Sequence, residues 1–155
     1  MRVEIFSRRA IMTLLESSFP QNTAVISFYS PMKEKRDAGR RVPYGERFDA
    51  VFYCEIPDID RECLEKYGYT EADYLAEADE IAEFIYRAKR EGLDIICQCD
   101  YGQSRSAACA AAILQHFEGR GIDIFADYRY YPNQLVYHKI YDALARAKSR
   151  ALETE

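Results

Sequence analysis

Short apolar runs alternate along the chain with longer stretches whose apolar residues recur at helical spacing. The apolar runs are bounded by polar or turn residues, which is typical of strands. They predict four strands, over residues 3–6, 24–29, 48–56 and 93–97. The helical stretches predict four helices, over residues 8–16, 70–91, 104–117 and 132–148. This alternation favours an α/β fold, with a mostly parallel central sheet of four to five strands flanked by helices.

Capping residues indicate where the helices begin and end. Ser7 precedes the first helix and is a suitable N-cap. Thr70 and Asp73 have the spacing of a capping box, and the apolar stripe that follows them stops at Gly92. Pro132 suits the first turn of the last helix. These signals predict one long helix from Thr70 and another from Pro132.

The length of 155 residues fits a single domain over residues 1–155. Residues 1–47 contribute the first strand, helix and second strand, followed by a basic connector, and residues 48–148 form the core that carries the candidate chemistry. The basic residues of the connector are Lys33, Lys35, Arg36, Arg40, Arg41 and Arg47. Acidic residues lie among them, so we interpret this segment as a solvated loop rather than a surface that recruits acidic substrates.

Charge and composition exclude several classes of function. A net charge of −5 argues against general nucleic-acid binding, and the sequence has no zinc-finger pattern. It contains no apolar run of about 18 residues, and its beginning lacks the order of a signal peptide, so we expect no membrane partner. The 5 cysteines form no disulfide framework, which favours a cytoplasmic protein with reduced thiols.

Residues 98–107, Gln-Cys-Asp-Tyr-Gly-Gln-Ser-Arg-Ser-Ala, join an apolar strand to an alanine-rich helix. A strand that turns directly into a helix points several backbone N–H groups and the positive helix end at one place, which favours a phosphate-sized anion. Gly102 permits a positive φ, and Ser104 can cap or brace the loop. Arg105 offers a planar fork to two oxygens. The same positive field favours the thiolate form of Cys99, which is a nucleophile.

Three segments together resemble a known family. Residues 99–106 resemble the signature loop of cysteine-dependent protein tyrosine and dual-specificity phosphatases, Cys-x-x-Gly-x-Ser-Arg-Ser. Residues 56–60, Ile-Pro-Asp-Ile-Asp, resemble the start of the general-acid loop in the dual-specificity branch. Residues 132–136, Pro-Asn-Gln-Leu-Val, resemble the Pro-Asn that opens a late helix beneath the signature loop. The resemblance extends over residues 48–145.

The resemblance implies hydrolysis of phosphate monoesters, on phosphorylated proteins or small molecules, without a metal or cofactor. Cys99 would form a cysteinyl-phosphate, Arg105 would bind the phosphate, and Ser106 would assist departure of the thiolate. The remaining phosphate-binding positions are Asp100, Tyr101, Gly102, Gln103 and Ser104. Asp60 matches the family's general acid, and Asp58 is the alternative. Asp is also common in turns, so a purely structural role for Asp60 stays open.

One position departs from the family pattern. Gln98 stands where the family has a His immediately before the nucleophile. In the family this His favours the thiolate and orders the loop, whereas Gln can donate hydrogen bonds but carries no charge. A weak or inactive phosphate-binding pseudophosphatase is therefore an alternative function. A thiol enzyme of another kind, such as a sulfurtransferase or an arsenate reductase, is a second one.

Asn133 is expected to cap the late helix and to hydrogen-bond the signature loop without touching substrate. Two further cysteines bear on the redox chemistry of Cys99. We expect Cys97 to be a small buried hydrophobe that points to the opposite face of its strand. Cys54 is the better candidate for a resolving thiol, because its strand could be the neighbour of the strand that leads to Cys99.

Overall fold

Four strands form one parallel sheet in the computed structural model, which describes residues 1–31 and 41–153. They are β1 Val3–Ser7, β2 Thr23–Tyr29, β3 Ala50–Glu55 and β4 Asp94–Cys99. The order in the sheet is β1-β4-β2-β3, and every neighbouring pair is parallel. The α/β fold with a parallel sheet is thus confirmed. Of the basic connector, Lys33, Lys35, Arg36 and Arg40 lie outside the described residues.

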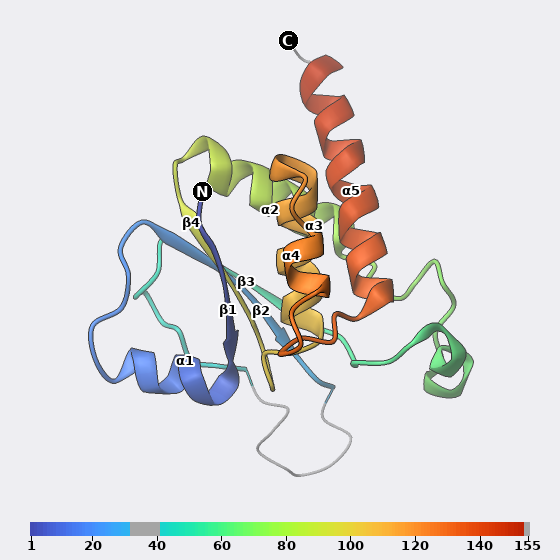
Figure 1. The fold of residues 1–155 in the computed structure, drawn as a ribbon, viewed down its shortest axis with the longest axis horizontal. Helices are drawn as coiled ribbons and strands as arrows, with labels where there is room; N and C mark the ends of the chain where they lie inside the picture. Colours follow the sequence, from blue (N-terminus) through green and yellow to red (C-terminus); the bar gives the residue numbers. More distant parts are fainter. Residues whose placement is uncertain (32–40, 154–155) are drawn as a thin grey trace.

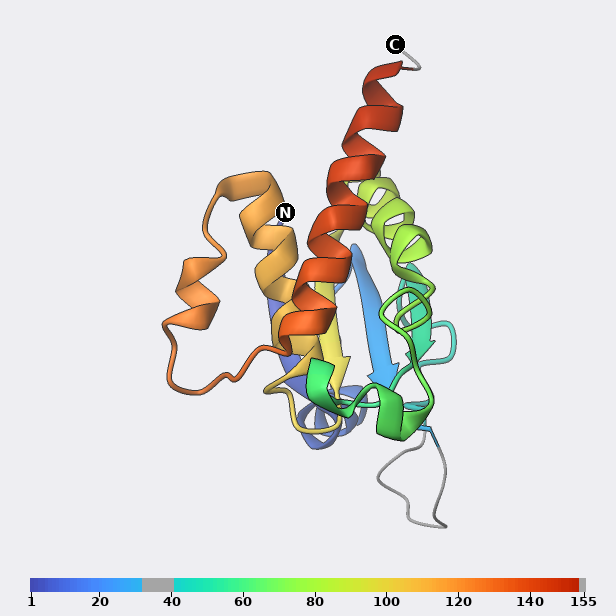
Figure 2. The same ribbon diagram turned by 90° about the vertical axis from the view of Figure 1, so that its right-hand side faces the viewer.

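Helices cover both faces of this sheet (Figures 1 and 2). One face carries α1 Arg8–Leu15, and the other carries α2 Ala78–Arg90, α3 Arg105–Glu118 and α5 Gln134–Glu153. The described part of the chain also contains three short helices: α4 Ile122–Phe125 and the 3-10 helices η2 Arg61–Cys63 and η3 Glu65–Tyr67. No helix among the described residues is both long and apolar enough to cross a membrane.

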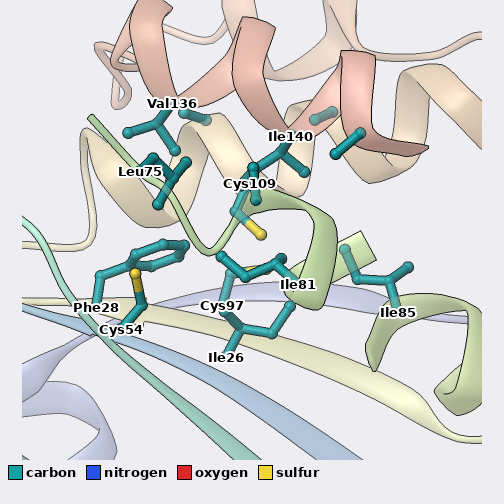
Figure 3. Packing of buried hydrophobic residues seen from close by; sticks show 14 of the residues in the cluster. Ile26, Phe28, Cys54, Leu75, Ile81, Ile85, Cys97, Cys109, Val136 and Ile140 are labelled. Carbon is teal, nitrogen blue, oxygen red and sulfur yellow. The ribbon is translucent and has the colours of Figure 1, made fainter. Parts of the chain in front are cut away.

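The two faces of the sheet have separate cores, because successive strand residues point to opposite sides. Ile26 of β2 and Cys97 of β4 pack beneath α2, α3 and α5 in the larger core (Figure 3). Val25 and Ile96 pack on the other side, with α1 and with residues 42–48. β2 lies in the interior of the sheet, and all its residues except the last are buried, as a strand covered on both faces requires.

The helix expected from Thr70 begins eight residues later, at the start of α2. The capping box itself forms, since the Thr70 N–H donates to Asp73 Oδ1 (2.6 Å) and the Asp73 N–H donates to Thr70 Oγ1 (3.2 Å). Leu75 then adopts a φ of +53°, which interrupts the helix. Tyr74 and Leu75 are both buried, and the Tyr74 hydroxyl donates to the Pro57 carbonyl (2.8 Å). Burial of these two side chains outweighs the cost of the left-handed residue.

The last helix also differs from the prediction at both ends. It begins at Gln134 rather than at Pro132, because the side chain of Asn133 accepts a hydrogen bond from the Val136 N–H (2.9 Å) and so caps the helix. It continues to Glu153, beyond the predicted end.

Candidate functional site

The loop of residues 99–105, hereafter the Cys99 loop, leaves β4 and enters α3 at the edge of the sheet where all four strands end (Figures 1 and 2). Gly102 has a φ of +68°, and a Cβ at this position would lie 2.7 Å from the backbone N of Ser7. The Arg8 N–H donates to the carbonyl of Asp100 (3.0 Å). The loop therefore packs directly on the junction of β1 and α1, and only glycine fits at residue 102.

The opposite side of the loop is held by the segment before α5. The Tyr131 N–H donates to the Gln103 carbonyl (2.8 Å), and the Asn133 N–H donates to the Ser104 carbonyl (3.1 Å). The contact of Asn133 with the loop is thus made by its backbone. The side chain of Ser104 makes no helix-capping hydrogen bond and instead reaches Asp58.

Cys99 lies at the base of the loop and is 2% exposed. Its Sγ is 3.0 Å from Oγ of Ser106, in the first turn of α3. The small residues after Ser106, five of which are alanines, allow α3 to pack closely against the sheet, and residues 105–113 are all buried. The thiol and the hydroxyl consequently share one buried location at the N-terminus of a 14-residue helix.

Arg105 is also buried, at 3% exposed, and its guanidinium is held by three other parts of the chain. Nη1 donates to the Ile56 carbonyl (2.7 Å) and to Ser30 Oγ (2.9 Å), and Nη2 donates to Asp100 Oδ2 (3.0 Å). Nε is buried and has no hydrogen-bond partner among the described residues. A buried cationic donor without a partner is costly, which makes it a candidate for anion binding.

The two candidate general acids have different surroundings. Oδ1 of Asp58 accepts hydrogen bonds from Ser104 Oγ (2.7 Å) and from Asn133 Nδ2 (2.8 Å), so this carboxylate is attached to the Cys99 loop. Asp60 instead caps η2, accepting a hydrogen bond from the Cys63 N–H (3.1 Å). Both residues are exposed.

Gln98 is buried on the face of the sheet opposite to Cys99, because adjacent strand residues alternate. Its Oε1 accepts hydrogen bonds from Ser27 Oγ (2.5 Å) and Tyr44 OH (2.6 Å), and its Nε2 donates to the Cys99 carbonyl (3.0 Å). Burial raises the pKa of Tyr44, so its hydroxyl stays protonated as the donor. No motif in the sequence marks Ser27, Ser30 or Tyr44, because these residues reach the site only through the order of the strands and the packing of the segment before β3.

Neither cysteine proposed as a partner for Cys99 occupies the expected position. Cys97 points to the same face as Cys99, because residues two apart on a strand do so, and the opposite-face expectation was wrong. β3, which carries Cys54, is separated from β4 by β2. Phe28 of β2 pairs with Cys54, so this phenylalanine lies between the two cysteines in the sheet (Figure 3 shows it beside Cys54).

Two side chains of the Cys99 loop, those of Tyr101 and Gln103, point into solvent. Tyr101 is 77% exposed and Gln103 is also exposed, so these two positions offer backbone groups rather than side chains to a ligand in the loop. The described residues include no group of three or more His, Cys, Asp or Glu side chains placed to hold a metal ion.

Two grooves adjoin the loop. One, of about 490 Å³, is lined by Asp58, Ser104 and His138, among other residues. The other, of about 710 Å³, runs along α1 and is lined by residues including Arg8 and Tyr101.

Comparison with solved structures identifies the fold as that of dual-specificity and tyrosine phosphatases. Human DUSP28 matches with a TM-score of 0.58 and 16% identity, over 96% of this chain and 94% of that one. PTPMT1 matches with a TM-score of 0.54 and 13% identity, over 98% and 95% of the two chains. Tk-PTP in its active form matches with a TM-score of 0.55 and 16% identity, over 94% and 92%. No protein-family model and no curated protein sequence matches the chain.

Proposed function

We propose that the protein is a cysteine-dependent phosphatase that hydrolyses phosphate monoesters of the phosphotyrosine or dual-specificity type. One observation carries the proposal. A buried thiol 3.0 Å from a hydroxyl and a buried arginine with an unpartnered Nε–H meet in one loop, at a helix N-terminus, on a phosphatase fold. These are the nucleophile and the anion-binding donors that phosphoryl transfer to a thiol needs.

In the first step, the Cys99 thiolate attacks phosphorus in line with the bond to the leaving oxygen. An S–P bond forms, the P–O bond breaks, and its electron pair leaves with the alcohol oxygen, which a carboxylic acid protonates. Arg105 and the loop N–H groups stabilise the charge on the phosphoryl oxygens. In the second step, water attacks phosphorus, the same carboxylate takes its proton, and the sulfur departs as thiolate with a hydrogen bond from the Ser106 hydroxyl.

The proton donor is Asp58 or Asp60. The family pattern favours Asp60, whereas contact with the Cys99 loop favours Asp58. The hydrogen bond between Asp58 and Ser104 attaches that carboxylate to the loop, and Asp60 is engaged in capping η2. Oδ2 of Asp58 makes no hydrogen bond with the described residues, so it is available to carry the proton. We therefore propose Asp58 as the general acid, with Asp60 as the competing assignment.

The test is hydrolysis of an activated aryl phosphate from pH 5 to 9 by wild type and by Cys99→Ser. We expect the variant to lose about a thousandfold or more in kcat/KM. Cys63→Ser is the matched control, because Cys63 is a half-buried cysteine in η2. Equal activity of wild type and Cys99→Ser would refute the proposal. Production of thiocyanate from thiosulfate, or reduction of arsenate, would instead support a different thiol reaction.

A phosphate-binding pseudophosphatase is the second candidate function, and Gln98 is the observation that favours it. The side chain next to the nucleophile is neutral and makes three hydrogen bonds. This position therefore lacks a positive charge that would favour the thiolate. Wild type that binds inorganic phosphate but turns over no aryl phosphate at any pH would select this function.

The substrate is proposed as a phosphorylated protein or a small phosphomonoester. The compartment is proposed as the cytoplasm, supported by the free state of all 5 cysteines.

A further inference from the structure

The hydrogen bonds of Arg105 divide its five N–H donors into two groups. Both N–H groups of Nη1 are used, one by the Ile56 carbonyl and one by Ser30 Oγ, and one N–H group of Nη2 is used by Asp100 Oδ2. Among the described residues, two donors have no partner: Nε–H and the second N–H of Nη2.

Ser30 and Asp100 occupy the end of the guanidinium rather than its side. Ser30 Oγ donates to Asp100 Oδ2 (3.0 Å), so these two oxygens are neighbours, one against Nη1 and the other against Nη2. The guanidinium has an end-on fork, formed by Nη1 and Nη2, and a side-on fork, formed by Nε and Nη2. Two neighbouring acceptors, one on each Nη atom, fit the end-on fork. The two unused donors therefore lie together on its side-on fork, which matches two oxygens of one tetrahedral anion.

The carboxylate that fixes this orientation belongs to the Cys99 loop itself. The Asp100 side chain is 11% exposed and that of Arg105 is 3% exposed, so the ion pair is almost fully desolvated. Asp100 is also held through its backbone, since its carbonyl accepts from the Arg8 N–H (3.0 Å). A loop anchored to β1 and α1 thus carries the acceptor that orients the arginine of α3.

We propose that Asp100 is a positioning residue that acts through Arg105. With Ser30, it holds the end-on fork, so that the side-on fork is kept free and aimed for the phosphoryl oxygens. In this role Asp100 acts on the substrate only through Arg105. Its Oδ1 is buried without a hydrogen-bond partner among the described residues, and the guanidinium offsets the charge of the carboxylate. The proposal deepens the proposed function and rests on phosphate binding in the Cys99 loop.

Asp100→Ala and Asp100→Asn separate orientation from charge. Asp100→Ala removes both the hydrogen bond and the charge, and Asp100→Asn keeps an oxygen that accepts from Nη2. We expect Asp100→Ala to weaken inorganic phosphate binding, measured by calorimetry, by about 10- to 100-fold, the usual cost of a hydrogen bond to a charged group. Asp100→Asn should stay within about threefold of wild type. Tighter phosphate binding in both variants, or unchanged binding in Asp100→Ala, would overturn the proposal, because Asp100 would then only repel the anion or be inert.

A double-mutant cycle with Arg105 tests whether Asp100 works through the guanidinium. In an Arg105→Lys background, which has no planar fork, Asp100→Ala should have little further effect on phosphate binding or kcat/KM. Losses that simply add would contradict the proposal. Asp79→Ala is the matched control, since Asp79 forms an exposed ion pair with Arg146 (3.0 Å) between α2 and α5. Circular dichroism and melting curves verify that each variant is folded.

Calorimetry distinguishes failure of this proposal from failure of the proposed function. If wild type binds phosphate without hydrolysing any ester, the phosphatase proposal fails and the role of Asp100 is still decided by the phosphate affinities. If wild type hydrolyses esters and Asp100→Ala binds and reacts like wild type, the role of Asp100 is refuted and the phosphatase proposal stands.

Discussion

Gln98 is a polar residue in the interior of a sheet, and the three hydrogen bonds it makes explain why it is tolerated there. Its side chain joins a hydroxyl of β2, a hydroxyl of the segment before β3 and the carbonyl of the proposed nucleophile. The motif predicted only that a charge was missing at this position. The compensating partners, Ser27 and Tyr44, are distant in sequence and could not be recognised without the strand order.

Replacement of Gln98 by Leu preserves volume but leaves the hydroxyls of Ser27 and Tyr44 buried without an acceptor. Each unsatisfied group costs about 1–3 kcal/mol, so we expect Gln98→Leu to lower the free energy of unfolding by about 2–6 kcal/mol, the sum for the two groups. Urea denaturation measures the change. The double variant Gln98→Leu, Tyr44→Phe removes one orphaned hydroxyl and should recover part of the loss. A loss of less than about 0.5 kcal/mol in Gln98→Leu would show that these hydroxyls find other partners.

Gly102 and Gly119 form a matched pair of left-handed glycines, with φ of +68° and +66°. A Cβ at Gly119, the C-cap of α3, meets nothing within 4 Å, whereas a Cβ at Gly102 meets the backbone of Ser7 at 2.7 Å. Substitution by Ala costs about 1–2 kcal/mol at either site for the backbone conformation. We expect Gly102→Ala to cost at least about 1 kcal/mol more in urea denaturation and to abolish phosphate binding. Equal behaviour of the two variants would contradict this account of the loop.

The competing assignments of the general acid predict opposite results for two isosteric variants. If Asp58 donates the proton, Asp58→Asn should lower kcat/KM for esters with poor leaving groups by about 10²- to 10⁴-fold, with a much smaller effect on activated aryl esters. Asp60→Asn should then change neither by more than about threefold, because it only weakens the cap of η2. The reverse pattern would assign the role to Asp60, as the sequence motif suggests.

At the scale of the elements, the sequence predicts the capping residues correctly but does not predict interruptions that depend on tertiary packing. The N-caps at Ser7 and Asn133 and the capping box at Thr70 all form, because each depends on a side chain and a backbone within three residues. The interruption at Leu75 has no such local cause. It arises because two consecutive side chains are drawn into the core, which a periodic pattern cannot reveal.

The contact between α2 and α3 predicts a pH dependence of stability. Tyr86 OH lies 2.6 Å from Nε2 of His116, and burial together with the charges of Lys148 and Lys89 lowers the pKa of His116. As the pH falls, His116 therefore binds a proton at a higher pH in the unfolded chain than in the folded protein. The stability contributed by neutral His116 is complete above about pH 6.5, the value for an unfolded chain, and is lost as the pH falls through the lower folded pKa.

Denaturation at pH 7 and pH 5 should consequently show a drop in wild type that is absent or smaller in His116→Gln, which does not titrate. The ring is only partly buried, so solvent screens its interactions and we expect a difference of no more than about 0.5 kcal/mol. The titration of the His116 ring proton, followed by NMR, checks the cause directly. A midpoint above that of an unfolded histidine would contradict the prediction.

At the scale of the whole molecule, the order of the strands determines which residues meet at the site. Placing β2 between β4 and β3 brings Ser30 to the guanidinium of Arg105 and Ser27 to Gln98. The sequence predicted the strands, their parallel direction and the edge where the loop lies. It could not predict their order, because alternating strands and helices are compatible with several arrangements.

The same order predicts how the protein responds to oxidation. Strands are spaced about 4.8 Å apart, so Cys54 and Cys99, separated by one intervening strand, have Cα atoms about 10 Å apart, beyond the usual limit of about 6.8 Å for a disulfide. In addition, burial and the nearby carboxylate of Glu77 raise the pKa of the Cys54 thiol to about 12, so it is not a thiolate at neutral pH. We expect hydrogen peroxide to oxidise Cys99 without forming a Cys54–Cys99 disulfide. Wild type and Cys54→Ala should lose activity, and regain it with dithiothreitol, at equal rates. A peptide linked through these two cysteines in unreduced mass spectra would show that β3 can move away from its place in the sheet.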